Sequence, residues 1–197
     1  MAGSRQTLDF YDREAGDYAE MAHKMTLPVE LAAFMAQVPE GGRILDLGCG
    51  SGWAANAFLK SGFEVTAMDG SAGLAAEAKS RYGIDVIVQR FGEMDWQDRF
   101  DGVWAWFTLM HAPRAEMDAN LARVQRALKT GGHFMIGFQE GDRDHTDTLG
   151  RHYSYFTEED MRARLTRAGF TPTKVMRRPG EHYDGTPTTE LSIAAHA

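Results

Sequence analysis

Residues 43–55, RILDLGCGSGWAA, decide the fold. Ile44, Leu45 and Leu47 form the unbroken apolar run that is typical of a parallel strand covered on both faces. Three glycines at alternate positions then permit positive φ angles and let a ligand approach the backbone closely. The alanine-rich segment that follows predicts a helix, which Gly62 ends. A glycine turn between a strand and a helix is typical of a nucleotide-binding corner.

The glycine spacing narrows the class of nucleotide that this corner can bind. No Gly-Lys-Ser/Thr follows the glycines, so the stretch is not a phosphate-binding P-loop. The dinucleotide pattern G-x-G-x-x-G/A would begin at Gly48, but Trp53 occupies its sixth position. An indole there would prevent close packing of the helix against the strand. Trp53 therefore opposes a nicotinamide-dependent oxidoreductase, which is the weaker alternative.

The segment Ile44–Gly52 resembles motif I of the class I S-adenosylmethionine-dependent methyltransferases, because a carboxylate in the strand is followed by Gly-Cys-Gly-Ser-Gly. The resemblance implies that S-adenosylmethionine is the cofactor and S-adenosylhomocysteine the product. It also implies that the strand carboxylate and the loop bind the cofactor, which here are Asp46, Gly48, Cys49 and Gly50.

The next predicted strand ends at a second carboxylate, Asp69. This residue follows Gly50 at about the 20-residue spacing at which a carboxylate meets the ribose hydroxyls in dinucleotide folds. Asp69, Gly70 and Ser71 also resemble the ribose-binding acidic turn of the methyltransferase family. Asp69 could instead cap the helix that follows. Its position relative to the glycine loop favours the ribose role.

Two later segments follow predicted strands at the same edge of the sheet. After the third strand the family holds the adenine ring, and the residues at that place are Phe91, Gly92, Glu93 and Met94. The fourth strand, residues 100–107, leads into a region that resembles the family's motif IV. We predict that Trp106 lies at the cofactor. We predict that His111 is the base or positions the acceptor, with a purely structural histidine as the alternative.

Residues 7–23 place apolar and aromatic side chains at helical spacing, which predicts an amphipathic helix. Such a helix usually covers a core. The segment Phe10–Tyr18 also resembles the N-terminal segment that closes over the methionine end of the cofactor in small members of the family. We therefore predict that residues 1–40 form a helical lid. Its Tyr11 and Tyr18 would face the cofactor and attract the cationic sulfonium.

Composition limits the partners that we expect. The net charge of −7 and the pI of about 5.5 oppose a broad nucleic-acid footprint or an anionic membrane surface. The single cysteine, Cys49, excludes a disulfide framework or a thiolate zinc site and suits a reducing cytosol. No run approaches the roughly 20 apolar residues of a membrane span. We expect a cytoplasmic protein that has no metal site and binds neither nucleic acid nor membrane.

Strands and helices alternate along the chain, which predicts an open α/β sheet. A fifth strand is expected over residues 133–138, followed by a polar loop over 139–154 and two strands at about 170–178 and 189–195. The short connection of the last pair implies an antiparallel strand, because a parallel crossover needs a dozen or more residues. This matches the family's doubly wound, seven-stranded sheet, mostly parallel with one antiparallel strand near the C-terminus, in a single domain over residues 1–197.

These observations predict an enzyme that transfers a methyl group from S-adenosylmethionine to a small-molecule acceptor. The sulfonium already activates the methyl group, so the protein mainly aligns the acceptor with it and removes a proton. A small acceptor is expected because the chain shows no added substrate domain. A non-catalytic module that only binds the cofactor remains an alternative, since it would keep Asp46, the glycines and Asp69 without an acceptor pocket.

Overall fold

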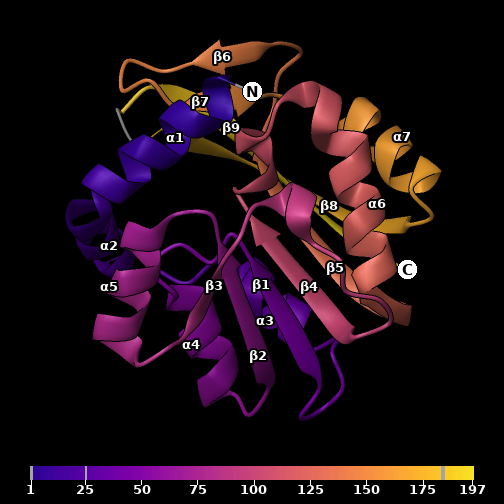
Figure 1. The fold of residues 1–197 in the computed structure, drawn as a ribbon. Helices are drawn as coiled ribbons and strands as arrows, with labels where there is room; N and C mark the ends of the chain where they lie inside the picture. The colour runs from indigo at the N-terminus through magenta and orange to yellow at the C-terminus, as the bar shows by residue number, and fades with distance from the viewer. Residues whose placement is uncertain (1, 25, 183–184) are drawn as a thin grey trace.

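The computed structural model describes residues 2–24, 26–182 and 185–197 (Figure 1). The helices are α1 (Ala2–Arg13), α2 (Ala15–Lys24), α3 (Val29–Met35), α4 (Trp53–Lys60), α5 (Ala72–Tyr82), α6 (Met117–Ala127) and α7 (Glu158–Arg167). Three 3₁₀ turns are η1 (Phe91–Glu93), η2 (Leu109–His111) and η3 (Arg114–Glu116). The sheet strands are β1 (Arg43–Leu47), β2 (Glu64–Asp69), β3 (Val86–Val88), β4 (Phe100–Trp106), β5 (Leu128–Gln139), β8 (Thr171–Glu181) and β9 (Pro187–His196). A separate hairpin pairs β6 (Asp144–Thr146) with β7 (His152–Ser154).

The seven strands lie in the order β3-β2-β1-β4-β5-β9-β8. β1 pairs in parallel with β2 and β4, and the parallel pairing continues to β3 on one side and to β5 on the other. β9 is antiparallel to both β5 and β8, so it is the reversed strand. The prediction of a mostly parallel seven-stranded sheet with one antiparallel strand near the C-terminus is confirmed.

Helices cover both faces of the sheet because the apolar strands present side chains to both. Ile44 and Trp104 belong to the cluster that α3 and α4 cover, with Phe58 of α4 fully buried between them. Leu45 and Val103, which are adjacent to these residues in the same strands, belong to the larger cluster under α6 and α7. This strict alternation explains why β1 is apolar at successive positions.

Two local predictions were wrong. The helix predicted over residues 7–23 is broken at Glu14 into α1 and α2. The segment 139–154 is not a simple loop, since residues 144–146 pair with 152–154 as the hairpin of β6 and β7. The hairpin depends on a buried ion pair between Asp147 and Arg151, which no hydrophobic pattern reveals. Both differences lie at the carboxyl edge of the sheet, beside the candidate site.

The strand order reverses between β1 and β4, because the chain builds outward from β1 to β3 and then returns to β4. In open α/β sheets, ligands bind in the crevice outside the carboxyl ends of the strands at such a point. α1 contacts α5, η2 and β7, so it lies across this edge of the sheet, as Figure 1 shows. Within the described ranges, no helix has the length and apolar character needed to cross a bilayer.

Candidate active site

The glycine loop after β1 packs directly against the segment after β4. Gly48 has φ +69°, and a Cβ built there would lie 1.7 Å from Thr108 Oγ1. The amides of Gly48 and Cys49 both donate to the carbonyl oxygen of Met68, at 2.7 and 3.0 Å. Gly48 is therefore required both by its backbone angle and by the close approach of the two loops.

Asp69 joins the glycine loop to the acidic turn after β2. Its Oδ2 accepts a hydrogen bond from the amide of Gly50 and its Oδ1 one from the amide of Ser71, both at 2.8 Å. Burial raises the pKa of Asp69. Each carboxylate oxygen can accept more than one hydrogen bond. Asp69 can therefore hold the loop and still receive ribose hydroxyls.

Asp46 and Cys49 are buried beside this loop. The pKa of Asp46 is raised to about 8 by burial, although the amide of Ala55 donates to the carboxylate and opposes the shift. Its Oδ2 is a buried oxygen with no hydrogen-bond partner among the described residues. Burial also raises the pKa of the Cys49 thiol, which argues against a reactive thiolate. An orphaned buried carboxylate oxygen next to a glycine loop fits a polar ligand that supplies the missing donor.

Tyr11 and His111 meet across the edge of the sheet, although 100 residues separate them. The Tyr11 hydroxyl lies 3.2 Å from His111 Nε2, and His111 Nδ1 lies 2.8 Å from the carbonyl oxygen of His152. A carbonyl oxygen only accepts, so Nδ1 carries the ring proton and Nε2 presents its lone pair to Tyr11. Burial lowers the pKa of His111 to about 4. The imidazole is therefore neutral at physiological pH, with a fixed tautomer.

A buried ion pair supports Tyr11 from the other side. Arg151 donates to Asp147 Oδ2 from Nε and Nη2, at 2.9 and 2.7 Å, and its Nη1 lies 3.4 Å from the Tyr11 hydroxyl. The two charged side chains are only 2% and 0% exposed. The Arg151 guanidinium also lies 5.0 Å from the ring centre of Phe10. Sequence reasoning missed this pair, whose only signal was two opposite charges four residues apart in a polar segment.

Two polar side chains of α1 tie this helix to the acidic turn and the hairpin. Asp12 Oδ1 accepts from Ser71 Oγ at 2.6 Å and from the amide of Gly73 at 2.9 Å. The amide of His152 donates to Thr7 Oγ1 at 2.9 Å. Tyr18 of α2 approaches the glycine loop, since a Cβ on Gly50 would lie 3.9 Å from its ring. The N-terminal helices therefore lie against the acidic turn and the hairpin and near the glycine loop.

The predicted adenine residues and Trp106 have mixed surroundings. Phe91 is half-buried, Gly92 and Glu93 are exposed, and Met94 is buried in the larger core cluster. Glu93 Oε2 accepts from the amide of Arg90 at 2.8 Å, so this carboxylate caps η1. Trp106 stacks on Trp104 on the α3 side of the sheet, with ring centres 4.7 Å apart. Cofactor contacts of these residues remain predictions.

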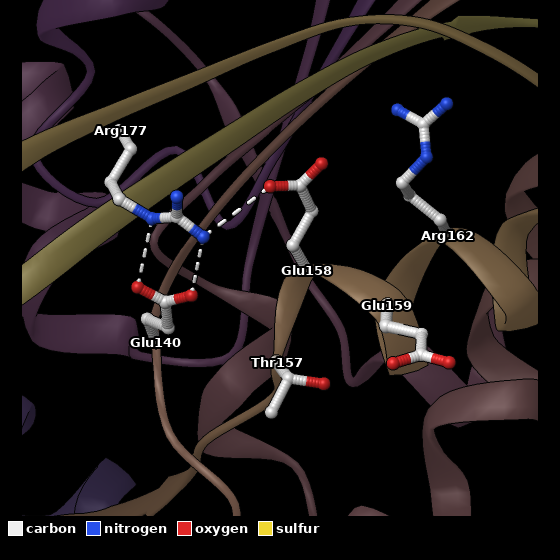
Figure 2. A pocket seen from close by; sticks show the side chains of 6 residues that line it. All are labelled: Glu140, Thr157, Glu158, Glu159, Arg162 and Arg177. Carbon is white, nitrogen blue, oxygen red and sulfur yellow. Dashed lines mark hydrogen bonds and ion pairs between the residues drawn. The ribbon is translucent and has the colours of Figure 1, made fainter.

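A hollow on another part of the surface is separate from this group. Figure 2 shows it between the start of α7 and β8, where Arg177 bridges Glu140 and Glu158. None of the predicted site residues lines it. Over the described part of the chain, no set of three or more histidine, cysteine or acidic side chains is arranged to hold a metal ion.

Comparisons with known proteins agree with this geometry. A family model described as "Methyltransferase domain" matches residues 19–175. The ubiquinone biosynthesis O-methyltransferase of Bradyrhizobium sp. (strain ORS 278) is 35% identical over 101 residues, which are 49% of this chain and 39% of that protein. The chain thus matches about two fifths of that relative's length.

Solved structures share the fold over nearly the whole chain. The 1,6-didemethyltoxoflavin-N1-methyltransferase of Burkholderia thailandensis, solved with bound 1,6-didemethyltoxoflavin and S-adenosylhomocysteine, has a TM-score of 0.80 and 26% identity, covering 99% of this chain and 88% of that one. The [4+2]-cyclase SpnF is 16% identical, and the match covers 98% of this chain and 96% of that one with a TM-score of 0.78. This is a likeness of fold alone. Because the family model spans most of the chain, the chain belongs to this methyltransferase-domain family, among the class I S-adenosylmethionine-dependent methyltransferases.

Proposed function

We propose that the protein transfers the methyl group of S-adenosylmethionine to a small-molecule acceptor. The observation that carries this proposal is the meeting of the glycine loop, Asp69 and the Tyr11–His111 pair at the point where the strand order reverses. The residues proposed to bind the cofactor and a neutral imidazole then lie at the same edge of the sheet. The Burkholderia N-methyltransferase, which acts on a small molecule, supports the small acceptor.

In this proposal the loop after β1 binds the methionine part of the cofactor and Asp69 binds the ribose. The orphaned Asp46 Oδ2 lies beside that loop and is available to a polar group of the cofactor. Tyr18 covers Gly50 and excludes water from the sulfonium. Residues 91–94 flank the adenine.

His111 acts on the acceptor and not on the cofactor. Its unprotonated Nε2 can take a proton from an acceptor group at hydrogen-bond distance. The cofactor itself supplies the activated methyl group. The chain's own contribution is to align the acceptor, exclude water and move one proton.

We also propose that, of the segment 1–40 predicted as a lid, α1 and α2 work as a helical lid on a single domain while α3 packs in the core with Trp104, and that the enzyme is cytoplasmic. The lid proposal is supported by the contacts of Thr7, Asp12 and Tyr18 with three different parts of the edge of the sheet. The location is supported by the single cysteine of the chain, which is buried and free.

Two glycine variants test the cofactor site against a matched control. Gly50 and Gly83 both have positive φ, +55° and +71°, and a Cβ at either meets no atom closer than 3.9 Å. Alanine should therefore cost each of them about 1 kcal/mol of backbone strain. Only Gly50→Ala should weaken S-adenosylhomocysteine binding in calorimetry, by about tenfold, because Gly83 caps the C-terminal end of α5 and is not part of the glycine loop. Equal affinity of the two variants, or saturable binding of NAD, would contradict the proposal.

A panel of acceptors tests whether the chain is an enzyme. We expect formation of S-adenosylhomocysteine to depend on a small acceptor and to fall in His111→Gln while cofactor affinity is unchanged. Because the pKa of His111 is about 4, the wild-type rate should not decline through loss of this base until the pH approaches that value. Equal affinity for S-adenosylmethionine and its product without turnover on any acceptor would instead indicate a binding module.

A further inference from the structure

The side chains under α1 form one directed chain of hydrogen bonds. It runs from Asp147 through Arg151 to the Tyr11 hydroxyl, then through His111 to the carbonyl oxygen of His152. Both ends determine its direction. Arginine can only donate and a carbonyl oxygen can only accept. The Tyr11 hydroxyl therefore accepts from Arg151 Nη1 and donates to His111 Nε2.

We propose that the Tyr11 hydroxyl occupies the place of the acceptor's own hydroxyl, and that the enzyme methylates an ionisable hydroxyl on a planar ring, a phenol or a ring enol. The inference rests on the proposed function and specifies its acceptor. When the lid shifts and Tyr11 withdraws, an incoming hydroxyl meets the same two partners. Arg151 then becomes a binding residue for the acceptor oxygen.

Arg151 and His111 together favour a hydroxyl over the other functional groups that accept a methyl group. The position needs one atom that accepts from a guanidinium and also gives a proton to a neutral imidazole. A carboxylate has no proton to give, and a thiol accepts hydrogen bonds weakly. A neutral amine would offer Arg151 the lone pair that must attack the methyl group. A hydroxyl oxygen has a second lone pair for that attack.

Aromatic rings around the position favour a flat acceptor. The Tyr11 ring lies edge-on to the rings of Phe10 and Tyr18, with centres 5.4 and 5.1 Å away. The Tyr153 ring lies 4.8 Å from the imidazole of His111. Tyr153 and His111 lie on β7 and η2, outside the lid, so a planar acceptor that enters when Tyr11 withdraws still meets these two rings, and aromatic contacts are worth more than simple burial.

The charged groups around the hydroxyl set the chemistry. Arg151 is the cation beside it, while the carboxylates of Asp147 and Asp69 oppose ionisation, and the phenols of Tyr18 and Tyr153 face the same space. Burial raises the pKa of Tyr11, so its hydroxyl remains protonated. His111 is a weak base, with a pKa of about 4. An acceptor hydroxyl must therefore be more acidic than an alcohol to give up its proton here.

The transfer step balances with these groups alone. The O–H bond of the acceptor breaks and its proton moves to His111 Nε2, giving an imidazolium. The oxygen lone pair forms the bond to the methyl carbon as the carbon–sulfur bond of the sulfonium breaks, and that electron pair remains on sulfur. The products are the methyl ether, neutral S-adenosylhomocysteine and a proton that the imidazolium later releases to water.

Calorimetry on the full chain saturated with S-adenosylhomocysteine tests the inference. The probe is 4-nitrophenol, with 4-nitroanisole and 4-nitroaniline as ring-matched controls that lack the hydroxyl. We expect 4-nitrophenol to bind at least about tenfold more tightly than either control, a difference of about 1.4 kcal/mol. Comparable binding of all three, or no binding of 4-nitrophenol, would overturn the inference. Failure of S-adenosylhomocysteine itself to bind would instead overturn the proposed function.

Two variants test whether the Tyr11 hydroxyl occupies the position of the acceptor hydroxyl or has only a structural role. Tyr11→Phe keeps the ring but removes the competing hydroxyl, so 4-nitrophenol should bind several-fold more tightly; weaker binding would mean that Tyr11 is part of the acceptor site. Arg151→Lys should weaken 4-nitrophenol binding about tenfold and leave 4-nitroaniline unchanged. Arg164→Lys is its control, since Arg164 pairs with Asp118 and Asp160 away from His111. If Arg151→Lys does not fold, the change of 4-nitrophenol affinity in Tyr11→Phe still tests the inference.

Discussion

Asp69 has both of its carboxylate oxygens engaged by backbone amides before any cofactor binds. The amides belong to Gly50 and Ser71, so this one side chain sets the distance between the two loops that are proposed to hold the cofactor. Charge-assisted hydrogen bonds of this kind contribute more than neutral ones. A substitution at Asp69 should therefore affect both binding and local order.

We predict that Asp69→Ala stays folded and binds cofactor at least about tenfold more weakly, which corresponds to 1.4 kcal/mol. The reason is the loss of both the ribose acceptor and the link between the loops, with hydrogen bonds to charged groups worth about 1.5–3 kcal/mol each. Calorimetry with S-adenosylhomocysteine measures the change. Asp85→Ala is the control, because Asp85 is exposed and pairs only at the surface with Lys79. Unchanged affinity in Asp69→Ala would remove this residue from the site.

Asp46 gives the stability of the protein a distinctive pH dependence. Its pKa is about 8 in the folded chain and 3.8 in the unfolded reference, so the folded state binds one more proton between these values. The free energy of unfolding should then fall as the pH rises through this window, by up to about 1.4 kcal/mol per pH unit. Asp46→Asn removes the titrating group and should reduce the fall by roughly 3.5 kcal/mol between about pH 5 and about pH 8. Urea unfolding at both pH values measures the free energy of unfolding of each protein. An equal change with pH in the wild type and in Asp46→Asn would contradict the burial of a neutral Asp46.

At the scale of an element, polar contacts join the C-terminal end of α1 to the turn after β2. Asp12 acts as an additional cap for α5, because it accepts the amide of Gly73 in the first turn and the hydroxyl of Ser71. The acidic turn after β2 is part of the same junction. Movement of the lid should therefore be coupled to order in the turn that is proposed to bind ribose.

Two helical glycines provide opposite perturbations of the lid. A Cβ at Gly73 would lie 2.8 Å from the carbonyl oxygen of Asp12, a backbone atom that cannot rotate away. A Cβ at Gly16 in α2 would lie 3.9 Å from Glu77, an ordinary contact. We expect Gly73→Ala to displace α1 and speed proteolysis within residues 2–24. Gly16→Ala should slow it, since alanine stabilises a helix by about 1 kcal/mol over glycine. Equal cleavage rates would contradict docking of α1 through Asp12.

At the scale of the whole molecule, the sheet was predictable because each strand leaves a local pattern. The apolar run of β1, the glycines after it and the spacing to Asp69 are all readable from neighbouring residues. The meeting of Tyr11 with His111 and Arg151 was not readable, because it depends on how α1 crosses the edge of the sheet. The tyrosine and the histidine could be named separately, but no sequence spacing states that their polar atoms touch.

The division between lid and core gives a last prediction. α1 and α2 bury Phe10, Ala15, Ala19 and Ala22, yet none of these belongs to the three core clusters, which begin at Leu31. A chain that starts at Pro28 keeps α3 and all seven strands. It should still melt cooperatively, because the sheet and the helices on both of its faces remain.

The shortened chain should nevertheless lose most of its cofactor affinity. It lacks Tyr18 over Gly50 and Asp12 at the acidic turn, so the cofactor would remain open to water and the turn less ordered. Calorimetry with S-adenosylhomocysteine and a thermal melt of the same sample measure both properties. If the shortened chain is unfolded, α1 and α2 belong to the folding core. If it is folded and binds the cofactor as the full chain does, the N-terminal helices are not a lid.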